Sequence, residues 1–183
     1  MFKFPVSNPK KYDEGVIVTS GTGSGKTLAF YLPVLGRISA KILSSPDPKK
    51  NWLQCLAIYP RVELQRDQFQ SLFKEARRLN ELLEVNGKRK LRLGILYGDT
   101  PGFFGSKDAS LSREQLSKKW KSAGNGFVCP YFKCWNDGCT GNFIWLFEDV
   151  NKREEKLVCS KCDEIIDSDE IALKDIEKFI IDG

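Results

Sequence analysis

The stretch "VTSGTGSGKTLAF", Val18–Phe30, decides the fold, because it places a glycine-rich turn between an apolar run and a helical pattern. Before it, Glu14–Thr19 is short, apolar and rich in β-branched residues, which predicts a buried strand. After it, apolar residues recur at helical spacing from Thr27 to Ser44 and predict an amphipathic helix. A strand, a tight glycine loop and a helix in this order are typical of a phosphate-binding loop.

The loop itself predicts a site for ATP and Mg²⁺. Its glycines let successive backbone N–H groups point at the β-phosphate, and the positive end of the following helix faces the same place. Lys26 supplies charge to the β and γ oxygens, and Thr27 offers a hydroxyl to the magnesium ion. The strict pattern has glycine at the first position, where this chain has Ser20. The predicted nucleotide-binding residues are Ser20, Gly21, Thr22, Gly23, Ser24, Gly25, Lys26 and Thr27.

The next segments continue the alternation of strands and helices. Leu53–Pro60 predicts a second strand that proline ends, Val62–Glu84 a strongly amphipathic helix, and Leu91–Gly98 a third strand. Strands that alternate with helices favour a parallel sheet covered on both faces. We therefore expect an α/β fold.

From Gly124 the chain becomes aromatic and rich in cysteine. Five of the six cysteines lie there, and Cys55 is expected to be a small core residue. The pairs Cys134/Cys139 and Cys159/Cys162, separated by roughly 20 residues, have the spacing of a four-cysteine Zn²⁺ site. "NFIWLF" predicts the strand between the pairs and "EKLV" the strand that returns to the second pair. Cys129 is an alternative to Cys134 as a ligand, because "FVC" and "LVC" enter their turns alike.

These changes of character divide the chain. We expect a nucleotide-binding domain over residues 1–123, a zinc ribbon over 124–168 and the start of a return to the first domain over 169–183. Five aromatic residues of the ribbon either stack on bases or form its core, and the sequence leaves both readings open. They are Phe127, Tyr131, Phe132, Trp135 and Trp145.

The length and amino-acid composition predict an ordinary folded chain with no membrane segment. Of 183 residues, 41% are hydrophobic and 29% charged, and no apolar run approaches the roughly 20 residues that cross a bilayer. The opening residues lack the features of a signal peptide, so we expect a cytoplasmic protein. Basic residues concentrate in Gly87–Leu93 and Ser117–Ala123. Each of these clusters either forms solvated protein surface or contacts a phosphate backbone, and the sequence leaves both interpretations open.

Three motifs resemble one known family. "TSGTGSGKTLAFYLPVL", "AIYPRVELQRDQ" (Ala57–Gln68) and "YGDTP" (Tyr97–Pro101) resemble, in order and spacing, the first RecA-like domain of superfamily-2 DEAD/DEAH-box helicases. In that family a small residue commonly takes the position of Ser20, and some large bacterial members carry a cysteine-rich insertion at this place. The resemblance implies that Arg61, Gln65 and Gln68 lie near the strand-binding face and Thr100 near the phosphodiester path.

The resemblance implies the ATP-binding portion of an ATP-dependent helicase or translocase that acts on DNA or RNA. Hydrolysis also needs a carboxylate pair after a core strand, and neither Asp163-Glu164 nor Asp169-Glu170 follows such a strand. We therefore expect no hydrolysis or unwinding by this chain alone, and a partnership with the remainder of a motor or a partner subunit. The alternative is a non-catalytic zinc-ribbon module that binds nucleic acid and keeps a relic phosphate loop.

Overall fold

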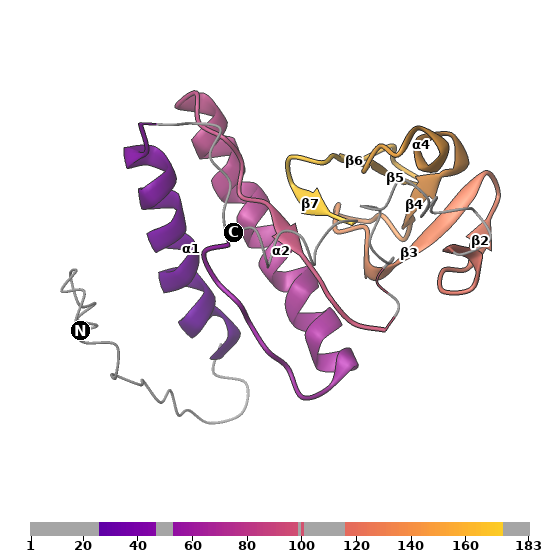
Figure 1. Cartoon of the computed structure of the whole chain (residues 1–183), viewed down its shortest axis with the longest axis horizontal. Coiled ribbons are helices and arrows are strands. Elements are labelled where there is room, and N and C mark those ends of the chain that lie inside the picture. Colours follow the sequence, from indigo (N-terminus) through magenta and orange to yellow (C-terminus); the bar gives the residue numbers. More distant parts are fainter. Residues whose placement is uncertain (1–25, 47–52, 99, 101–115, 174–183) are drawn as a thin grey trace, which may run out of the picture.

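The computed structural model describes residues 26–46, 53–98, 100 and 116–173. The predicted strand Glu14–Thr19 and the loop residues Ser20–Gly25 therefore lie outside the described residues. Two long helices, α1 (Lys26–Ser44) and α2 (Val62–Val85), lie side by side in Figure 1 and match the two helices that the sequence predicts.

The two helices share a small apolar core. Leu35 and Ile42 of α1 pack against Ala76 and Leu83 of α2, with Leu91 closing the cluster. These positions recur at helical spacing, which is why each helix buries only one face.

A buried amide ties α2 to the chain that follows it. The Asn80 side chain donates to the carbonyl oxygen of Leu91 at 3.3 Å and accepts from the Leu91 backbone N–H at 2.6 Å. It satisfies both backbone groups of that residue, as a neighbouring strand would, and so fixes the approach to the first strand.

The parallel sheet is smaller than the sequence predicts. It has two strands, β1 (Leu93–Gly94) and β7 (Ile171–Ala172), so β1 is only the centre of the predicted strand Leu91–Gly98. The predicted strand over residues 53–60 is wrong: this segment is irregular, and Leu56 and Ile58 are 62% and 84% exposed. A parallel strand needs a hydrogen-bonded neighbour and cover on its faces. Within the described residues this segment is hydrogen-bonded to no strand.

A second, antiparallel sheet follows. Its five strands run in chain order: β2 (Ser122–Ala123), β3 (Gly126–Lys133), β4 (Asn142–Leu146), β5 (Leu157–Cys159) and β6 (Ile165–Ile166). A short helix, α4 (Phe147–Lys152), connects β4 to β5. The strand predicted between the two cysteine pairs is confirmed as β4. The strand predicted to lead into the second pair is confirmed as β5.

Aromatic side chains form the core of this second sheet. Phe127, Tyr131, Phe132 and Trp145 are all buried, and Trp135 packs against them partly exposed. The four buried rings are therefore core residues, and their surfaces are not open to stack on bases.

The same core crosses the division expected at residue 123. It takes in Phe69 and Phe73 from α2, and Leu116 and Trp120 from the segment before β2. The ribbon is packed against the helical half, because α2 contacts β3. The division itself remains a prediction.

In the part of the chain that the structure describes, no helix combines the length and the apolar character needed to cross a membrane.

Candidate functional site

The start of α1 is the described end of the predicted nucleotide site. The helix begins at Lys26, and Thr27 lies half-buried in its first turn. The free backbone N–H groups of a first turn and the helix dipole both favour a bound anion. The other six residues of the loop lie outside the described residues, so the nucleotide contacts remain a prediction.

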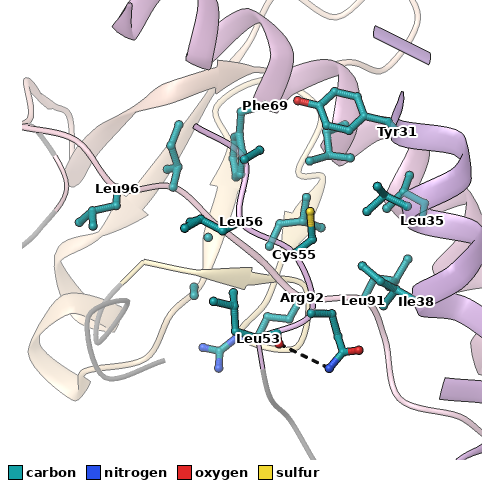
Figure 2. A pocket seen from close by; sticks show the side chains of 18 of the residues that line it. Tyr31, Leu35, Ile38, Leu53, Cys55, Leu56, Phe69, Leu91, Arg92 and Leu96 are labelled. Carbon is teal, nitrogen blue, oxygen red and sulfur yellow. Dashed lines mark hydrogen bonds between the residues drawn. The ribbon is translucent and has the colours of Figure 1, made fainter. Parts of the chain in front are cut away.

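A hollow of about 360 Å³ opens farther along α1, between that helix, residues 53–59, α2 and β1. Figure 2 shows Tyr31 and Leu35 of α1 facing Cys55 and Phe69 across it. Its lining is largely apolar. Thr27, the described residue of the predicted nucleotide site, is not one of the described residues that line it.

Cys55 was expected to be a core residue, and this expectation is wrong. Cys55 is exposed at the edge of the hollow, because the segment that contains it is not part of a sheet. Partial burial still raises the pKa of the Cys55 thiol above its ordinary value.

Three of the four predicted nucleic-acid residues lie at the N-cap and in the first two turns of α2. Arg61 is the N-cap residue and is exposed, and Gln68 is half-buried. The Gln65 side-chain amide donates to the Leu96 carbonyl oxygen at 3.2 Å. This bond connects the start of α2 to the chain that leaves β1.

Thr100, the fourth predicted residue, is buried and engaged in the turn after β1. Its hydroxyl donates to the Ile95 carbonyl oxygen and accepts from the Tyr97 backbone N–H, both at 2.9 Å. The Lys119 ammonium donates to the Thr100 carbonyl oxygen at 2.7 Å. The side chain therefore shapes the turn, and direct contact with a strand remains a prediction.

The four predicted zinc ligands come together. The sulfur atoms of Cys134, Cys139, Cys159 and Cys162 all lie within 4.8 Å of one another. Cys134 and Cys162 are separated by 3.6 Å between sulfurs, as are Cys139 and Cys159. Zinc–sulfur bonds of about 2.3 Å in a tetrahedron put the sulfurs about 3.8 Å apart. The cluster is compatible with zinc.

Polar groups around the cluster orient the thiols. The Gly141 backbone N–H donates to the Cys139 sulfur at 3.4 Å, and the Asn136 amide donates to the Cys162 sulfur at 3.5 Å. A Cβ atom at Gly141 would overlap the Cys159 sulfur, so only glycine fits there. Outer contacts of this kind are a regular part of metal sites.

The thiols of the cluster differ in acidity. Burial, together with the neighbouring thiols, raises the pKa of Cys134 to about 12. A hydrogen bond from the Glu164 backbone N–H lowers the pKa of Cys162 to about 7. Metal ions bind thiolates, so occupation of the site must release the proton of Cys134.

Cys129, the alternative ligand, is not one of these four. It is buried in the aromatic core, where desolvation raises the pKa of its thiol to about 12. These surroundings are typical of an inert core cysteine.

Sequence reasoning missed Arg77, which connects α2 to the ribbon. Its guanidinium forms ion pairs with Glu164 and, at 3.1 Å, with Glu170, and it lies 5.3 Å from the ring centre of Trp135. Although burial opposes ionisation, hydrogen bonds from Arg77 and Asn136 lower the pKa of Glu164. One arginine therefore binds the glutamate of each carboxylate pair, Asp163-Glu164 and Asp169-Glu170, that the sequence analysis judged unsuitable for hydrolysis.

Glu155 is a second missed connection. One oxygen accepts from the Arg92 guanidinium and the other from the Leu173 backbone N–H, both at 2.6 Å. This buried carboxylate holds the chain after β7 beside the chain before β1. Neither it nor Arg77 carries a sequence signal, because the paired residues lie far apart in the chain.

Comparison with known proteins gives one match. A family model described as DEAD/DEAH box helicase matches residues 8–101, just over half of the chain. The cysteine cluster lies outside the matched range. No curated protein and no solved structure matches the chain.

Proposed function

Because the chain belongs to the DEAD/DEAH box helicase family, we propose that it is the ATP-binding portion of an ATP-dependent nucleic-acid helicase or translocase. The observation that carries the proposal is the match itself, whose range includes the phosphate loop Ser20–Thr27 and the segments that contain Arg61 and Thr100. Membership of this family implies the use of ATP with Mg²⁺ and the binding of nucleic acid.

In this proposal Lys26 binds the β and γ phosphates and Thr27 the magnesium ion. The start of α1 at Lys26 supports these roles, because it sets both residues where the helix dipole attracts phosphate. Arg61, Gln65 and Gln68 face the nucleic acid from the first turns of α2.

The four-cysteine cluster holds a structural zinc ion in this proposal. Four thiolates complete a tetrahedral shell and leave no open position for water or substrate. The ion fixes the turn after β3 against the turn after β5, and so closes one end of the ribbon.

We also propose that the 183-residue chain binds ATP without hydrolysing it. The ion pairs that Arg77 makes with Glu164 and Glu170 support this proposal, because they engage the two glutamates of the carboxylate pairs in the sequence. Hydrolysis and unwinding then require the remainder of a motor or a partner subunit.

One observation favours the second candidate, a zinc-ribbon module that binds nucleic acid and keeps a relic loop. The ribbon has a filled aromatic core, whereas the half that carries the loop has an apolar hollow of about 360 Å³. A loop without a well-packed domain behind it would not hold its geometry.

Calorimetric titration of the zinc-loaded protein with a non-hydrolysable ATP analogue and Mg²⁺ separates the two candidates. We expect binding that Lys26→Ala abolishes and that Lys41→Ala, an exposed lysine at the other end of α1, leaves unchanged. Absence of binding in folded wild-type protein, with nucleic-acid binding retained, would favour the relic-loop module.

A further inference from the structure

The two basic clusters of the sequence have different environments. In Gly87–Leu93 the charged groups are used inside the protein: Lys88 and Arg89 donate to backbone carbonyls, Lys90 pairs with Glu84, and Arg92 pairs with Glu155. That cluster is structural.

Most of the second cluster, Ser117–Ala123, lies in the turn Leu116–Lys121. Leu116 and Trp120 are fully buried, and Lys118, Lys119 and Lys121 are exposed. The six residues include no acidic residue. The two buried residues hold the turn against the core, and the Trp120 backbone N–H donates to the Leu116 carbonyl oxygen at 2.8 Å. The backbone that carries the three lysines is therefore fixed at both of these residues.

This basic turn is hydrogen-bonded to Thr100, the residue predicted to lie near the phosphodiester path of the nucleic acid. The Lys119 ammonium donates to the Thr100 carbonyl, which leaves two of its three N–H donors for other partners. Below them, Trp120 packs edge-on against Tyr131 and Tyr131 against Tyr97, with ring centres 5.4 and 5.7 Å apart. These contacts connect the basic turn to the turn after β1.

We propose that the basic turn Leu116–Lys121 extends the nucleic-acid surface, with Lys118 and Lys121 contacting the phosphodiester backbone of a strand that passes the turn at Thr100. This inference rests on the proposed nucleic-acid binding and adds to it a second set of contacts. Phosphate contacts of this kind position a strand without reading its sequence. The surface therefore binds the backbone of any sequence.

The salt dependence of binding measures these contacts. Each phosphate contact to a single strand contributes about −0.7 to the slope of log K against log salt. We expect Lys118→Gln/Lys121→Gln to flatten the slope by about 1.4, which corresponds to binding about 25-fold weaker near 0.1 M salt. Lys119 stays unchanged in this variant, so that its bond to Thr100 is kept.

The matched control removes the same charge from the structural cluster. Lys88→Gln/Arg89→Gln should leave the slope within experimental error of the wild-type value. Fluorescence anisotropy with labelled oligothymidylate and oligouridylate, between about 50 and 200 mM salt, gives both slopes. The change should appear with DNA and RNA alike, since both carry the phosphate. Zinc content and near-ultraviolet circular dichroism check that each variant is folded.

Equal slopes for the two double variants would overturn the inference. If Arg61→Ala still weakens binding in that case, the proposed function stands and only the extension is wrong. Failure of the wild-type protein to bind either oligonucleotide would overturn both the extension and the nucleic-acid part of the proposed function.

Discussion

Among the residues that the structure describes, those in the half of the chain with the family motifs are less completely packed than those in the half with the cysteines. Around β3 and β4, aromatic rings are fully buried and the four thiols converge on one point. Around residues 53–59, Leu56 and Ile58 are exposed and a hollow separates the segment from α1. The difference shows that a hairpin meander closes its core with neighbours in sequence, whereas a parallel sheet needs strands from distant parts of the chain.

Loss of the proposed zinc ion is the change with the largest expected effect on this comparison. Structural zinc contributes about 10–16 kcal/mol in small zinc-finger peptides, comparable to or greater than the roughly 5–15 kcal/mol stability of a whole domain. We expect Cys159→Ser to abolish stoichiometric zinc and to expose Trp145 to water. Zinc analysis and tryptophan emission measure the two effects.

Two other cysteines serve as controls for the metal site. Cys55→Ser and Cys129→Ser lie outside the cluster and should retain one zinc per chain. If Cys129→Ser lost the metal while Cys134→Ser retained it, the ligand set would be the alternative that the sequence left open.

Truncation of one side chain in each half tests the packing difference itself. Phe143 is 0% exposed, with ring centres of Phe132 and Trp135 at 5.4 and 4.8 Å, so Phe143→Ala should cost about 3–5 kcal/mol. Ile58 is 84% exposed, and Ile58→Ala should change stability by less than about 0.5 kcal/mol. Urea unfolding of the zinc-loaded protein gives both values. A large cost at Ile58 would mean that this segment is packed in solution, and would remove the contrast between the halves.

What the sequence could and could not predict follows the same division. The two long helices depend on residues close together in the chain, and they were predicted correctly. The spacing of the cysteines predicted four ligands for zinc, and their sulfur atoms do come together, while the ion itself stays a prediction. The predicted strand at Leu53–Pro60 is wrong, because an apolar run reports a tendency to be buried and says nothing about the neighbour that a strand requires. The engagement of the Thr100 hydroxyl within its own turn also has no sequence signal.

The smallest of the expected effects concerns the connection between the halves. Arg77→Ala removes the partner of the buried Glu170 carboxylate, and leaving such a group unpaired costs about 1–3 kcal/mol. The neighbouring Arg78 forms only an exposed pair with Glu75, so Arg78→Ala should cost about 0.5 kcal/mol or less. Because Glu170 directly precedes β7, loss of Arg77 should also speed hydrogen exchange at the Leu93 amide, which donates to the Glu170 carbonyl.

A double variant distinguishes a true connection from a local packing defect. If Arg77→Ala loses stability because the Glu170 carboxylate is left buried without its partner, Arg77→Ala/Glu170→Gln should recover part of the lost free energy of unfolding. The glutamine side chain carries no charge to desolvate. Purely additive costs would assign the loss to contacts of the arginine with Trp135 and Glu164. Equal costs for Arg77→Ala and Arg78→Ala would mean that the ion pairs of Arg77 add little to the connection between the halves. The connection would then rest on contacts such as the shared aromatic core and the pair of Arg92 with Glu155.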